Sequence, residues 1–269
     1  MIEMICGDSM QIMEGMRQRM KPSFDMIFLD PPYFEWADKT PLPNHNTLSY
    51  LAYSLLKPNG CVFLCGTQPQ MARDWRWWDR WFNLNFELIA YKHAGTPPTS
   101  RKKLLLIHEN IWCLYSKKDS FDDLKIDTRR VSKAGRVVKV EDKADRMQTR
   151  YGEDWMEWRT DVGYPKSVQF VFRIDQHSKE YEGHPAQKPL NLTKLIVKMS
   201  TDEGDWVLDP FAGVGTTLVA CQQLERNCLG IEINPEYIRL TRRRLARIQA
   251  FEKLEGYIND SKLTPPASV

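Results

Sequence analysis

The feature that most constrains the fold is a strand, a glycine turn and a helix in immediate succession near the carboxyl end. The stretch GDWVLDPFAGVGTTLVA, residues 204–220, begins with an apolar strand at Trp206–Leu208 and leads into a helix predicted over Thr216–Glu225. A second apolar strand follows at Cys228–Ile233. Strands joined through a helix are typical of a parallel sheet.

The amino-terminal part repeats this alternation. Leucines at helical spacing predict a helix over Thr47–Lys57 that ends at the turn Pro58-Asn59-Gly60, and a second apolar stripe predicts one over Lys188–Ser200. Apolar runs predict further strands at Ile2–Cys6, Asp25–Leu29, Cys61–Cys65, Phe86–Tyr91 and Asn110–Tyr115. We therefore expect an α/β fold with a mostly parallel sheet and helices on both faces.

Composition narrows the class of protein. A chain of 269 residues, 42% hydrophobic, is long enough for one large domain or a domain with an insertion. A net charge of +3 permits a nucleic-acid partner through local patches. The six cysteines form no CxxC pair and no zinc-ligand spacing, and no apolar run reaches membrane-spanning length. We expect a soluble cytoplasmic protein with no metal and no membrane partner.

The stretch FDMIFLDPPYF, residues 24–34, ends a buried-looking strand in Asp30-Pro31-Pro32-Tyr33. Two successive prolines prevent further strand pairing and hold the backbone stiff where it leaves the sheet. A fixed carboxylate beside a fixed ring suits a planar ligand with hydrogen-bond donors on its edge. An acidic turn without function is the alternative interpretation.

The loop DPFAGVGTT discriminates between nucleotide-binding classes. A dinucleotide fingerprint would need a third glycine where Leu218 stands, and a phosphate-binding loop would need Gly-Lys-Ser/Thr, which the sequence lacks. Glu232 ends the next strand, 17 residues beyond Gly215, where an acid can accept hydrogen bonds from a ribose diol. S-adenosylmethionine fits this combination. A glycine turn that serves packing alone is the alternative.

Three motifs in this order, DPPY, HPAQKP (residues 184–189) and DPFAGVGTT, resemble those of amino-group DNA methyltransferases of the adenine-N6/cytosine-N4 type. The catalytic motif precedes the cofactor loop, as in the beta class of that family. The resemblance covers roughly 1–115 and 184–245. It implies a Rossmann-like, S-adenosylmethionine-dependent methyltransferase fold with an inserted target-recognition region.

The resemblance also implies a division of the chain. Residues 1–116 would form the catalytic part and 184–250 the cofactor-binding part of one domain. Residues 117–183 would be the inserted variable region, and 251–269 a tail. Within the tail, NDSKLTPPASV (259–269) has a composition that predicts disorder.

The resemblance implies catalytic roles for the DPPY residues. Asp30 and the backbone carbonyl of Pro31 would accept hydrogen bonds from the exocyclic amino group of the target base. Pro32 completes the motif, and Tyr33 would stack on the base. The base would have to leave the DNA stack to reach these groups.

Cofactor contacts follow in the same way, with S-adenosylhomocysteine as the product. Glu232 would hold the ribose hydroxyls, and Asp8 would bind the adenine amino group, with a helix N-cap at Asp8 or Ser9 as the alternative. The remaining cofactor candidates are Asp30, His184, Gln187, Lys188, Asp209, Phe211, Ala212, Gly213, Gly215 and Thr216.

DNA contacts are expected from a basic window. Residues 125–150 hold nine Lys/Arg against four Asp/Glu, a net charge of +5. The DNA-binding candidates are Arg129, Arg130, Lys133 and Arg136. A solvated charged face is the alternative, because most charge runs are only that.

Several interpretations of function remain open at this stage. Adenine-N6 methylation of DNA is favoured over cytosine-N4 methylation because cytosine-N4 enzymes of the family more often begin the motif with Ser. Methylation of RNA or protein, and a non-catalytic DNA-binding partner subunit, are the other candidates. A homodimer and a bacterial, archaeal or phage origin are expected from the family alone.

Two further features have weaker assignments. Trp75, Trp78 and Trp81 lie at i, i+3 and i+6, and helix packing is favoured over stacking on bases. His108-Glu109 precedes a predicted strand and resembles a family motif without an evident chemical role.

Overall fold

The computed structural model describes residues 1–33, 42–96, 102, 104–131, 133–134, 162–163, 165–171 and 173–263. Within these residues, eight strands form one sheet in the order β1-β10-β9-β2-β3-β5-β4-β8. Its strands are β1 (Ile2–Cys6), β2 (Phe24–Leu29), β3 (Leu56–Gly66), β4 (Phe82–Thr96), β5 (Leu106–Ser116), β8 (Val168–Val171), β9 (Trp206–Asp209) and β10 (Asn227–Glu232). Among them, β5 alone runs antiparallel to its neighbours. The expected mostly parallel sheet is confirmed.

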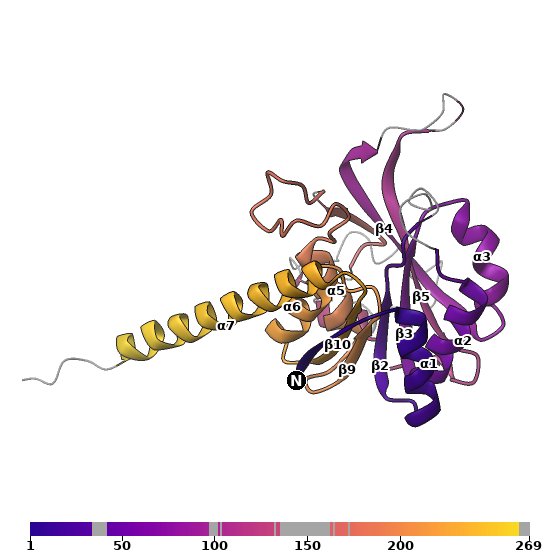
Figure 1. The fold of residues 1–269 in the computed structure, drawn as a ribbon, viewed down its shortest axis with the longest axis horizontal. Helices are drawn as coiled ribbons and strands as arrows, with labels where there is room; N and C mark the ends of the chain where they lie inside the picture. Colours follow the sequence, from indigo (N-terminus) through magenta and orange to yellow (C-terminus); the bar gives the residue numbers. More distant parts are fainter. Residues whose placement is uncertain are drawn as a thin grey trace, which may run out of the picture.

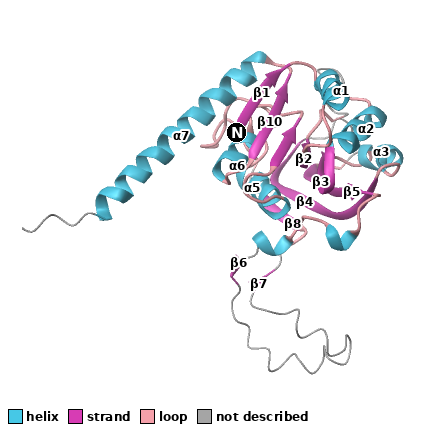
Figure 2. Ribbon diagram, turned by 90° about the horizontal axis from the view of Figure 1, so that it is seen from below, coloured by secondary structure: helices cyan, strands magenta, loops and turns pink. Residues whose placement is uncertain are grey.

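Helices cover both faces of this sheet, as predicted (Figures 1 and 2). The helices are α1 (Ser9–Arg19), α2 (His45–Leu55), α3 (Gln70–Trp78), α5 (Leu190–Ser200), α6 (Thr216–Gln223) and α7 (Pro235–Leu263). The first three lie on one face, whereas α5 and α6 lie on the other, and α7 projects from the body as a long rod (Figure 2).

The central strand β2 shows why the sheet needs two layers of helices. All six of its residues are buried. Ile27 and Leu29 belong to the core beneath α1 to α3, whereas Met26 and Phe28 belong to the core beneath α5 and α6. Because successive side chains of a strand point to opposite faces, a continuous apolar run can fill both cores.

The strand order reverses between β9 and β2. These two strands are parallel neighbours, paired through Met26 with Val207 and Ile27 with Leu208. From β9 the sheet continues through β10 to β1. From β2 it continues in the opposite direction, through β3. In open parallel sheets, such a reversal opens a crevice at the carboxyl ends of the two strands, where ligands bind.

The structure differs from the sequence predictions at some element ends. The predicted turn Pro58-Asn59-Gly60 lies inside β3, where a register shift against β2 and a positive φ of 63° at Asn59 form a bulge. At the other end of the chain, α7 continues to Leu263, so disorder from residue 259 onward was wrong for this part of the tail.

The segment expected to be inserted contributes to the body as well. Two short 3-10 turns, η2 (Phe121–Asp123) and η3 (Thr128–Val131), follow β5, and the Asp127 N–H donates to the Met199 carbonyl at 2.8 Å. Strand β8 extends the main sheet by pairing with β4. A separate two-stranded ribbon joins β6 (Lys133–Ala134) to β7 (Val162–Gly163).

The tryptophan cluster packs inside the protein, as favoured by its spacing. Trp78 is fully buried, and Trp75 meets Trp112 edge to face with ring centroids 5.3 Å apart. Trp81 stacks on Tyr53 at 4.9 Å. These rings join α3 to α2 and to the sheet.

Two negative observations apply to the described part of the chain. None of its helices is both long and apolar enough to cross a membrane. It also contains no group of three or more His, Cys, Asp or Glu side chains placed to hold a metal ion. All six cysteines are free thiols.

Candidate active site at the carboxyl ends of β2 and β9

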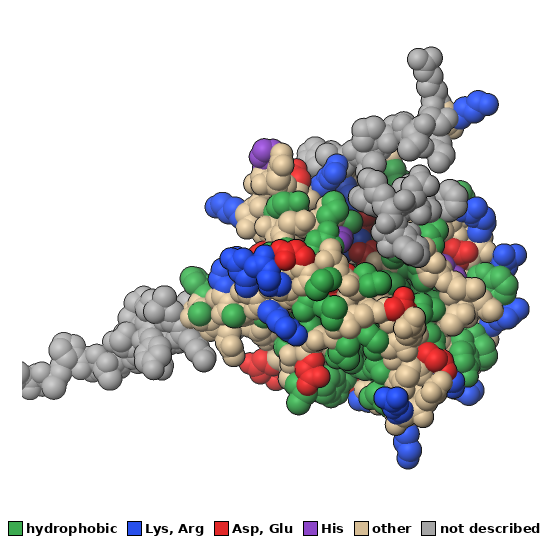
Figure 3. Space-filling view, in the orientation of Figure 1, with side chains coloured by type: hydrophobic (Ala, Val, Ile, Leu, Met, Phe, Trp, Pro, Cys, Tyr) green, Lys and Arg blue, Asp and Glu red, His purple; other side chains and the backbone are tan. Residues whose placement is uncertain are grey.

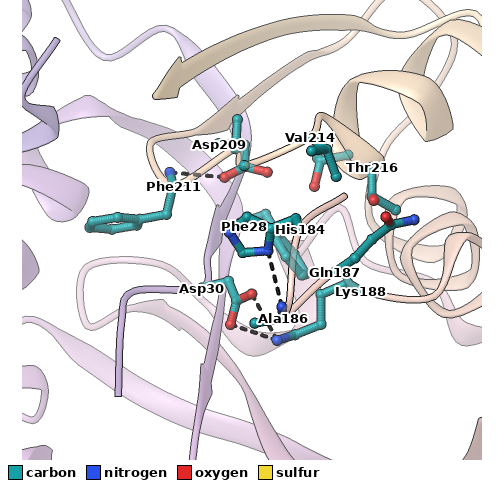
Figure 4. Close-up of a pocket in the computed structure, with 13 residues that line it drawn as sticks. Phe28, Asp30, His184, Ala186, Gln187, Lys188, Asp209, Phe211, Val214 and Thr216 are labelled. Carbon is teal, nitrogen blue, oxygen red and sulfur yellow. Dashed lines mark hydrogen bonds and ion pairs between the residues drawn. The ribbon is translucent and has the colours of Figure 1, made fainter. Parts of the chain in front are cut away.

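A pocket opens in the crevice between β2 and β9. Asp30 follows β2 directly, and Asp209 is the last residue of β9, so two carboxylates reach the pocket from adjacent strands (Figure 4). The lining residues are Phe28, Asp30, His184, Ala186, Gln187, Lys188, Asp209, Phe211, Ala212, Gly213, Val214, Thr216 and Thr217. Three sequence motifs that are far apart in the chain thus meet here.

The DPPY motif forms a rigid acidic corner at the exit of β2. The Tyr33 hydroxyl donates to Asp30 Oδ1 at 2.8 Å, so the ring and the carboxylate are held together. Burial, and then the charges of Asp30 and Glu109, raise the pKa of Tyr33. Tyr33 therefore stays protonated and remains a donor to Asp30.

Lys188 of the HPAQKP motif faces Asp30 across the pocket. Its Nζ lies 2.8 Å from Oδ1 and 2.7 Å from Oδ2 of Asp30 (Figure 4). The same Nζ lies 3.3 Å from the Tyr33 hydroxyl. Only 8% of Lys188 is exposed. Burial by itself would lower the pKa of Lys188, but Asp30 and Glu109 outweigh it and raise that pKa, so the side chain is an ammonium ion.

Glu109 stands behind this ion pair, in β5. Its Oε2 lies 3.2 Å from Lys188 Nζ, and its Oε1 accepts from Lys92 of β4. Burial would raise the pKa of Glu109, but Lys188 and Lys92 together lower it to about 2. The sequence offered a weak signal for Glu109 in the pair His108-Glu109, and none for Lys92.

The glycine loop turns sharply between β9 and α6. Gly213 and Gly215 have positive φ values of 52° and 73°, a region that favours glycine. The Gly213 N–H donates at 2.9 Å to Glu232 Oε2, and the Asn234 N–H donates at 2.8 Å to Glu232 Oε1. Glu232 therefore holds the loop at the end of β10 and is not among the lining residues of the pocket.

Asp209 is buried beneath the glycine loop. Burial raises its pKa to about 7, although bonds from the Thr217 hydroxyl and the Phe211 N–H favour the ionised form. The Phe211 bond measures 3.0 Å to Oδ1 (Figure 4). Asp209 can thus change its protonation near neutral pH, according to the charge of what enters the pocket.

His184 closes the pocket from the side of α7. Its Nδ1 accepts from the Ala186 N–H at 3.2 Å, so the neutral ring carries its proton on Nε2. Burial lowers the pKa of His184, which keeps the ring neutral. The ring packs edge to face on Tyr237 with centroids 4.6 Å apart, so His184 presents a fixed donor.

Gln187 and Asp8 both hydrogen-bond to nearby backbone. The Gln187 amide donates to the Glu180 carbonyl at 2.6 Å and accepts from the Glu182 N–H at 2.9 Å, so it organises the turn before α5. Asp8 accepts from the Gln11 N–H at 2.9 Å as the N-cap of α1, which is the alternative that its sequence left open. Neither Asp8 nor Gly215 is among the residues that line the pocket.

Arg244 of α7 supports the glycine loop from behind, a role that sequence reasoning missed. Its Nη1 lies 3.2 Å from the Val214 carbonyl and 3.1 Å from Thr216 Oγ1, and the residue is 3% exposed. The arginines of α7 appeared in the sequence as one basic group. Only the packing shows that these arginines lie on different faces of α7, since Arg242 and Arg243 are exposed. Lys and Arg side chains gather on the surface of α7 (Figure 3).

The candidate DNA contacts are described only in part. Arg130 forms an ion pair with Asp202, with Nη2 3.1 Å from Oδ1. The side chains of Arg129 and Lys133, and all of Arg136, lie outside the described residues. Their role stays a prediction.

The pocket suits a cofactor that carries both charges. Asp30 and Asp209 favour a cation, and the backbone amides at the start of α6, near Thr216, favour a carboxylate. S-adenosylmethionine has a sulfonium, an ammonium and a carboxylate. The donors and acceptors present therefore fit this group.

Comparison with known proteins places the chain in one family. The profile of the DNA methylase family N6_N4_Mtase matches residues 24–243. The Type II methyltransferase M2.DpnII of Streptococcus pneumoniae is 28% identical over 257 residues, which cover 84% of each chain. The DNA adenine methyltransferase YhdJ of Escherichia coli is 47% identical over 81 residues, 30% of this chain and 28% of that protein.

Solved structures share the fold. The M1.HpyAVI–SAM complex has a TM-score of 0.61 at 22% identity, covering 91% of this chain and 100% of that chain. The cytosine-N4-specific PvuII DNA methyltransferase has a TM-score of 0.62 at 16% identity, covering 89% of this chain and 84% of that chain. The arrangement of sheet and helices described above is therefore that of known methyltransferases.

Proposed function

This chain belongs to the family of N6/N4 DNA methylases, and we propose that within it the protein transfers a methyl group from S-adenosylmethionine to the N6 amino group of adenine in DNA. The Type II methyltransferases among its relatives favour restriction–modification as its setting. Within the family's activity, adenine is thus the proposed target base, and the residues of the pocket have the roles given below.

One observation carries the assignment of residues. The Asp30 carboxylate stands at the end of β2, in the same pocket as the glycine loop that follows β9. An acceptor for an amino group and the expected site of the methyl donor are thus placed side by side. Holding two reactants next to each other in this way lowers the entropic part of the activation barrier.

The side chains act on a weak nucleophile. An exocyclic amine is unreactive because its lone pair is delocalised into the ring. Asp30 and the carbonyl of Pro31 would hold its two hydrogens and favour a pyramidal nitrogen whose lone pair is free. When bound, S-adenosylmethionine would supply an electrophilic methyl group, and Asp30 and Pro31 would hold the amine so that its lone pair faces that methyl.

The pocket lies at the carboxyl ends of the central strands β2 and β9. The target base would have to rotate out of the duplex to reach Asp30 there. Tyr33 would provide a ring face for the flipped base. Its hydroxyl bond to Asp30 fixes the ring relative to the carboxylate. His184 and the amides at the start of α6 would hold the methionine part of the cofactor.

Adenine is favoured by the residue that begins the motif. An aspartate at position 30 is the commoner choice in adenine-N6 enzymes of the family, whereas cytosine-N4 enzymes more often have Ser. YhdJ, whose name specifies adenine, is similar over part of this chain. Cytosine-N4 methylation is the second candidate because the cytosine-N4-specific PvuII enzyme shares the fold.

The test is transfer of labelled methyl from S-adenosylmethionine to mixed-sequence duplex DNA, followed by digestion to nucleosides. Label in N6-methyladenine supports the proposal. Label in N4-methylcytosine keeps the mechanism and changes the base. Absence of label in both, with the cofactor bound, contradicts the proposed function and favours a non-catalytic subunit or another substrate.

The finer assignments are also proposals. We propose that 1–116 and 184–250 form one methyltransferase domain and that the region 117–183 reads the target sequence. Homodimerisation remains an expectation that sedimentation equilibrium would test.

A further inference from the structure

Glu109 is a buried charge that the proposed chemistry leaves without a role. It is 8% exposed and lies between two lysines, Lys92 on its Oε1 and Lys188 near its Oε2. Among the described residues, Oε2 has no hydrogen-bond partner although Lys188 Nζ is only 3.2 Å away. A buried carboxylate oxygen without a hydrogen bond is costly, so this arrangement calls for an explanation.

The Lys188 ammonium is engaged mainly with the DPPY corner. An ammonium has three N–H donors, and this one contacts both oxygens of Asp30 and the Tyr33 hydroxyl. Lys188 therefore contacts both oxygens of the carboxylate that would accept the amino hydrogens of the target base. A positive charge in that place would also oppose the positive charge that develops on the amine during methyl transfer.

We propose that Glu109 is a positioning residue that draws the Lys188 ammonium off Asp30 when the target base enters. The ammonium would turn to Glu109 Oε2, its neighbour at 3.2 Å, and Asp30 would accept the amino hydrogens of the base in its place. The inference rests on the proposed function, since it concerns how the same pocket admits its substrate.

Charge balance explains why two lysines are present. Asp30, Glu109, Lys188 and Lys92 together are neutral, so these four side chains add no net charge to the resting site. After the ammonium turns, Lys92 and Lys188 share Glu109, and the negative charge of Asp30 is left to face the amine. A preorganised charge at that point stabilises the transition state.

The simplest alternative is that Glu109 only ties β5 to the segment before α5. A structural tie and a positioning role both predict a slower methyl transfer when Glu109 is changed. They differ in which second substitution restores the rate. If Lys188 blocks Asp30 in the absence of Glu109, then removal of the Lys188 charge should restore activity. If Glu109 is only a tie, removal of a second tie member should cause further loss.

The experiment compares Glu109→Gln, Glu109→Asp, Lys188→Met and the double variant Glu109→Gln/Lys188→Met in single-turnover methylation of duplex DNA. Glu109→Gln should lower the rate of methyl transfer about 100-fold, the scale of losing one preorganised active-site group, with the cofactor Kd changed less than about threefold. Glu109→Asp should recover part of this rate. The double variant should be at least about tenfold faster than Glu109→Gln, because the freed Asp30 no longer carries the ammonium.

The matched control is Glu87→Gln in β4. Glu87 is also a partly buried carboxylate of this sheet, but it accepts from Asn110 at 2.7 Å and Trp112 at 3.0 Å, away from Asp30. It should keep the wild-type transfer rate. A double variant slower than Glu109→Gln, or a Glu109→Gln enzyme with the wild-type rate, overturns the inference. A wild-type protein that methylates no DNA instead overturns the proposed function.

Discussion

Thr241 of α7 lies so close to Gly215 that a Cβ on Gly215 would come within 2.3 Å of Thr241 Cγ2. The threonine cannot retreat, because it is fully buried and its hydroxyl donates to the Tyr237 carbonyl at 2.9 Å and the Gly213 carbonyl at 3.3 Å. The glycine loop is thus clamped between the sheet and α7. Cofactor binding should depend on this contact.

Gly215→Ala should therefore weaken both the fold and cofactor binding. Gly204 is the matched control, since its φ of 82° is also positive but a Cβ there would meet nothing within 4 Å. Gly204→Ala should cost about 1–2 kcal/mol of unfolding free energy for backbone strain. Gly215→Ala should cost about 1–3 kcal/mol more for overpacking. Chemical denaturation and calorimetric titration with S-adenosylmethionine measure both; equal losses in the two variants would argue against the clamp.

Asp30→Ala should reduce methyl transfer at least about 100-fold while cofactor affinity persists. The fold should tolerate the change because Lys188 keeps Glu109 as a counterion. Asp79→Ala, which removes an exposed carboxylate paired with Lys117, is the control. Transfer of labelled methyl and equilibrium binding separate the two effects. Loss of cofactor binding together with transfer would assign Asp30 to the cofactor site or to the structure of the pocket, and not to the target base.

Arg244→Met should weaken cofactor binding by loosening the loop at Val214 and Thr216. Removal of a buried arginine that leaves Glu182 with fewer partners should cost about 3 kcal/mol of unfolding free energy. The adjacent Arg243 is exposed, so Arg243→Met is a control of the same composition that should leave stability within about 0.5 kcal/mol. Thermal unfolding with and without S-adenosylmethionine measures the effect. Equal behaviour of the two variants would show that Arg244 does not support the loop.

Asp209 should make stability depend on pH. Its pKa is raised by burial to about 7 in the folded protein, against about 3.8 as the ordinary value, so the folded state holds the proton more tightly. The proton on Asp209 therefore adds to the free energy of unfolding. This addition is complete below about pH 4, falls as pH rises, and is lost above about pH 7, a change of about 4 kcal/mol. Asp209→Asn should remove this slope. Urea denaturation of both proteins between pH 4 and 8 measures it, and parallel curves would exclude Asp209 as the source.

Charge reversal in the region of η3 should weaken DNA binding. Arg129→Glu/Lys133→Glu should lower the affinity for DNA. It should also make the plot of log binding constant against log salt concentration less steep, by a slope of roughly one for each phosphate that is no longer neutralised. Arg130 should contribute less because it already pairs with Asp202. Lys21→Glu is the control, since Lys21 is exposed just before β2, at the end of the strand away from Asp30. Unchanged affinity at several salt concentrations would place the DNA interface elsewhere, and the exposed arginines of α7 would be the next to test.

Local sequence determined much of the architecture. The apolar run of β2 and the two prolines after Asp30 predicted both the strand and its end, because each acts on neighbouring residues. The glycines of the loop likewise indicated a sharp turn. The ion pair between Glu109 and Lys188 could not be predicted in this way, since it depends on the insertion of β5 antiparallel to β3.

The same limit explains the residues whose partners were missed. Gln187 lies in a recognisable motif, yet its amide hydrogen-bonds to the backbone of Glu180 and Glu182, an outcome that motif spacing alone does not reveal. Arg244 differs from its exposed neighbours only by the face of α7 on which it lies. Which face is buried depends on the long-range packing of α7 on the glycine loop.

The pairing of β1 with β10 has a consequence for biosynthesis. Ile2 pairs with Cys228, which is synthesised 226 residues later, and the strand before Asp30 pairs with β9, which is also synthesised late. Because β9 and β10 come from residues 206–232, the sheet cannot close and the pocket cannot form until these residues have been translated. A chain that ends before residue 206 would thus carry the DPPY corner without the glycine loop, and it should form no pocket.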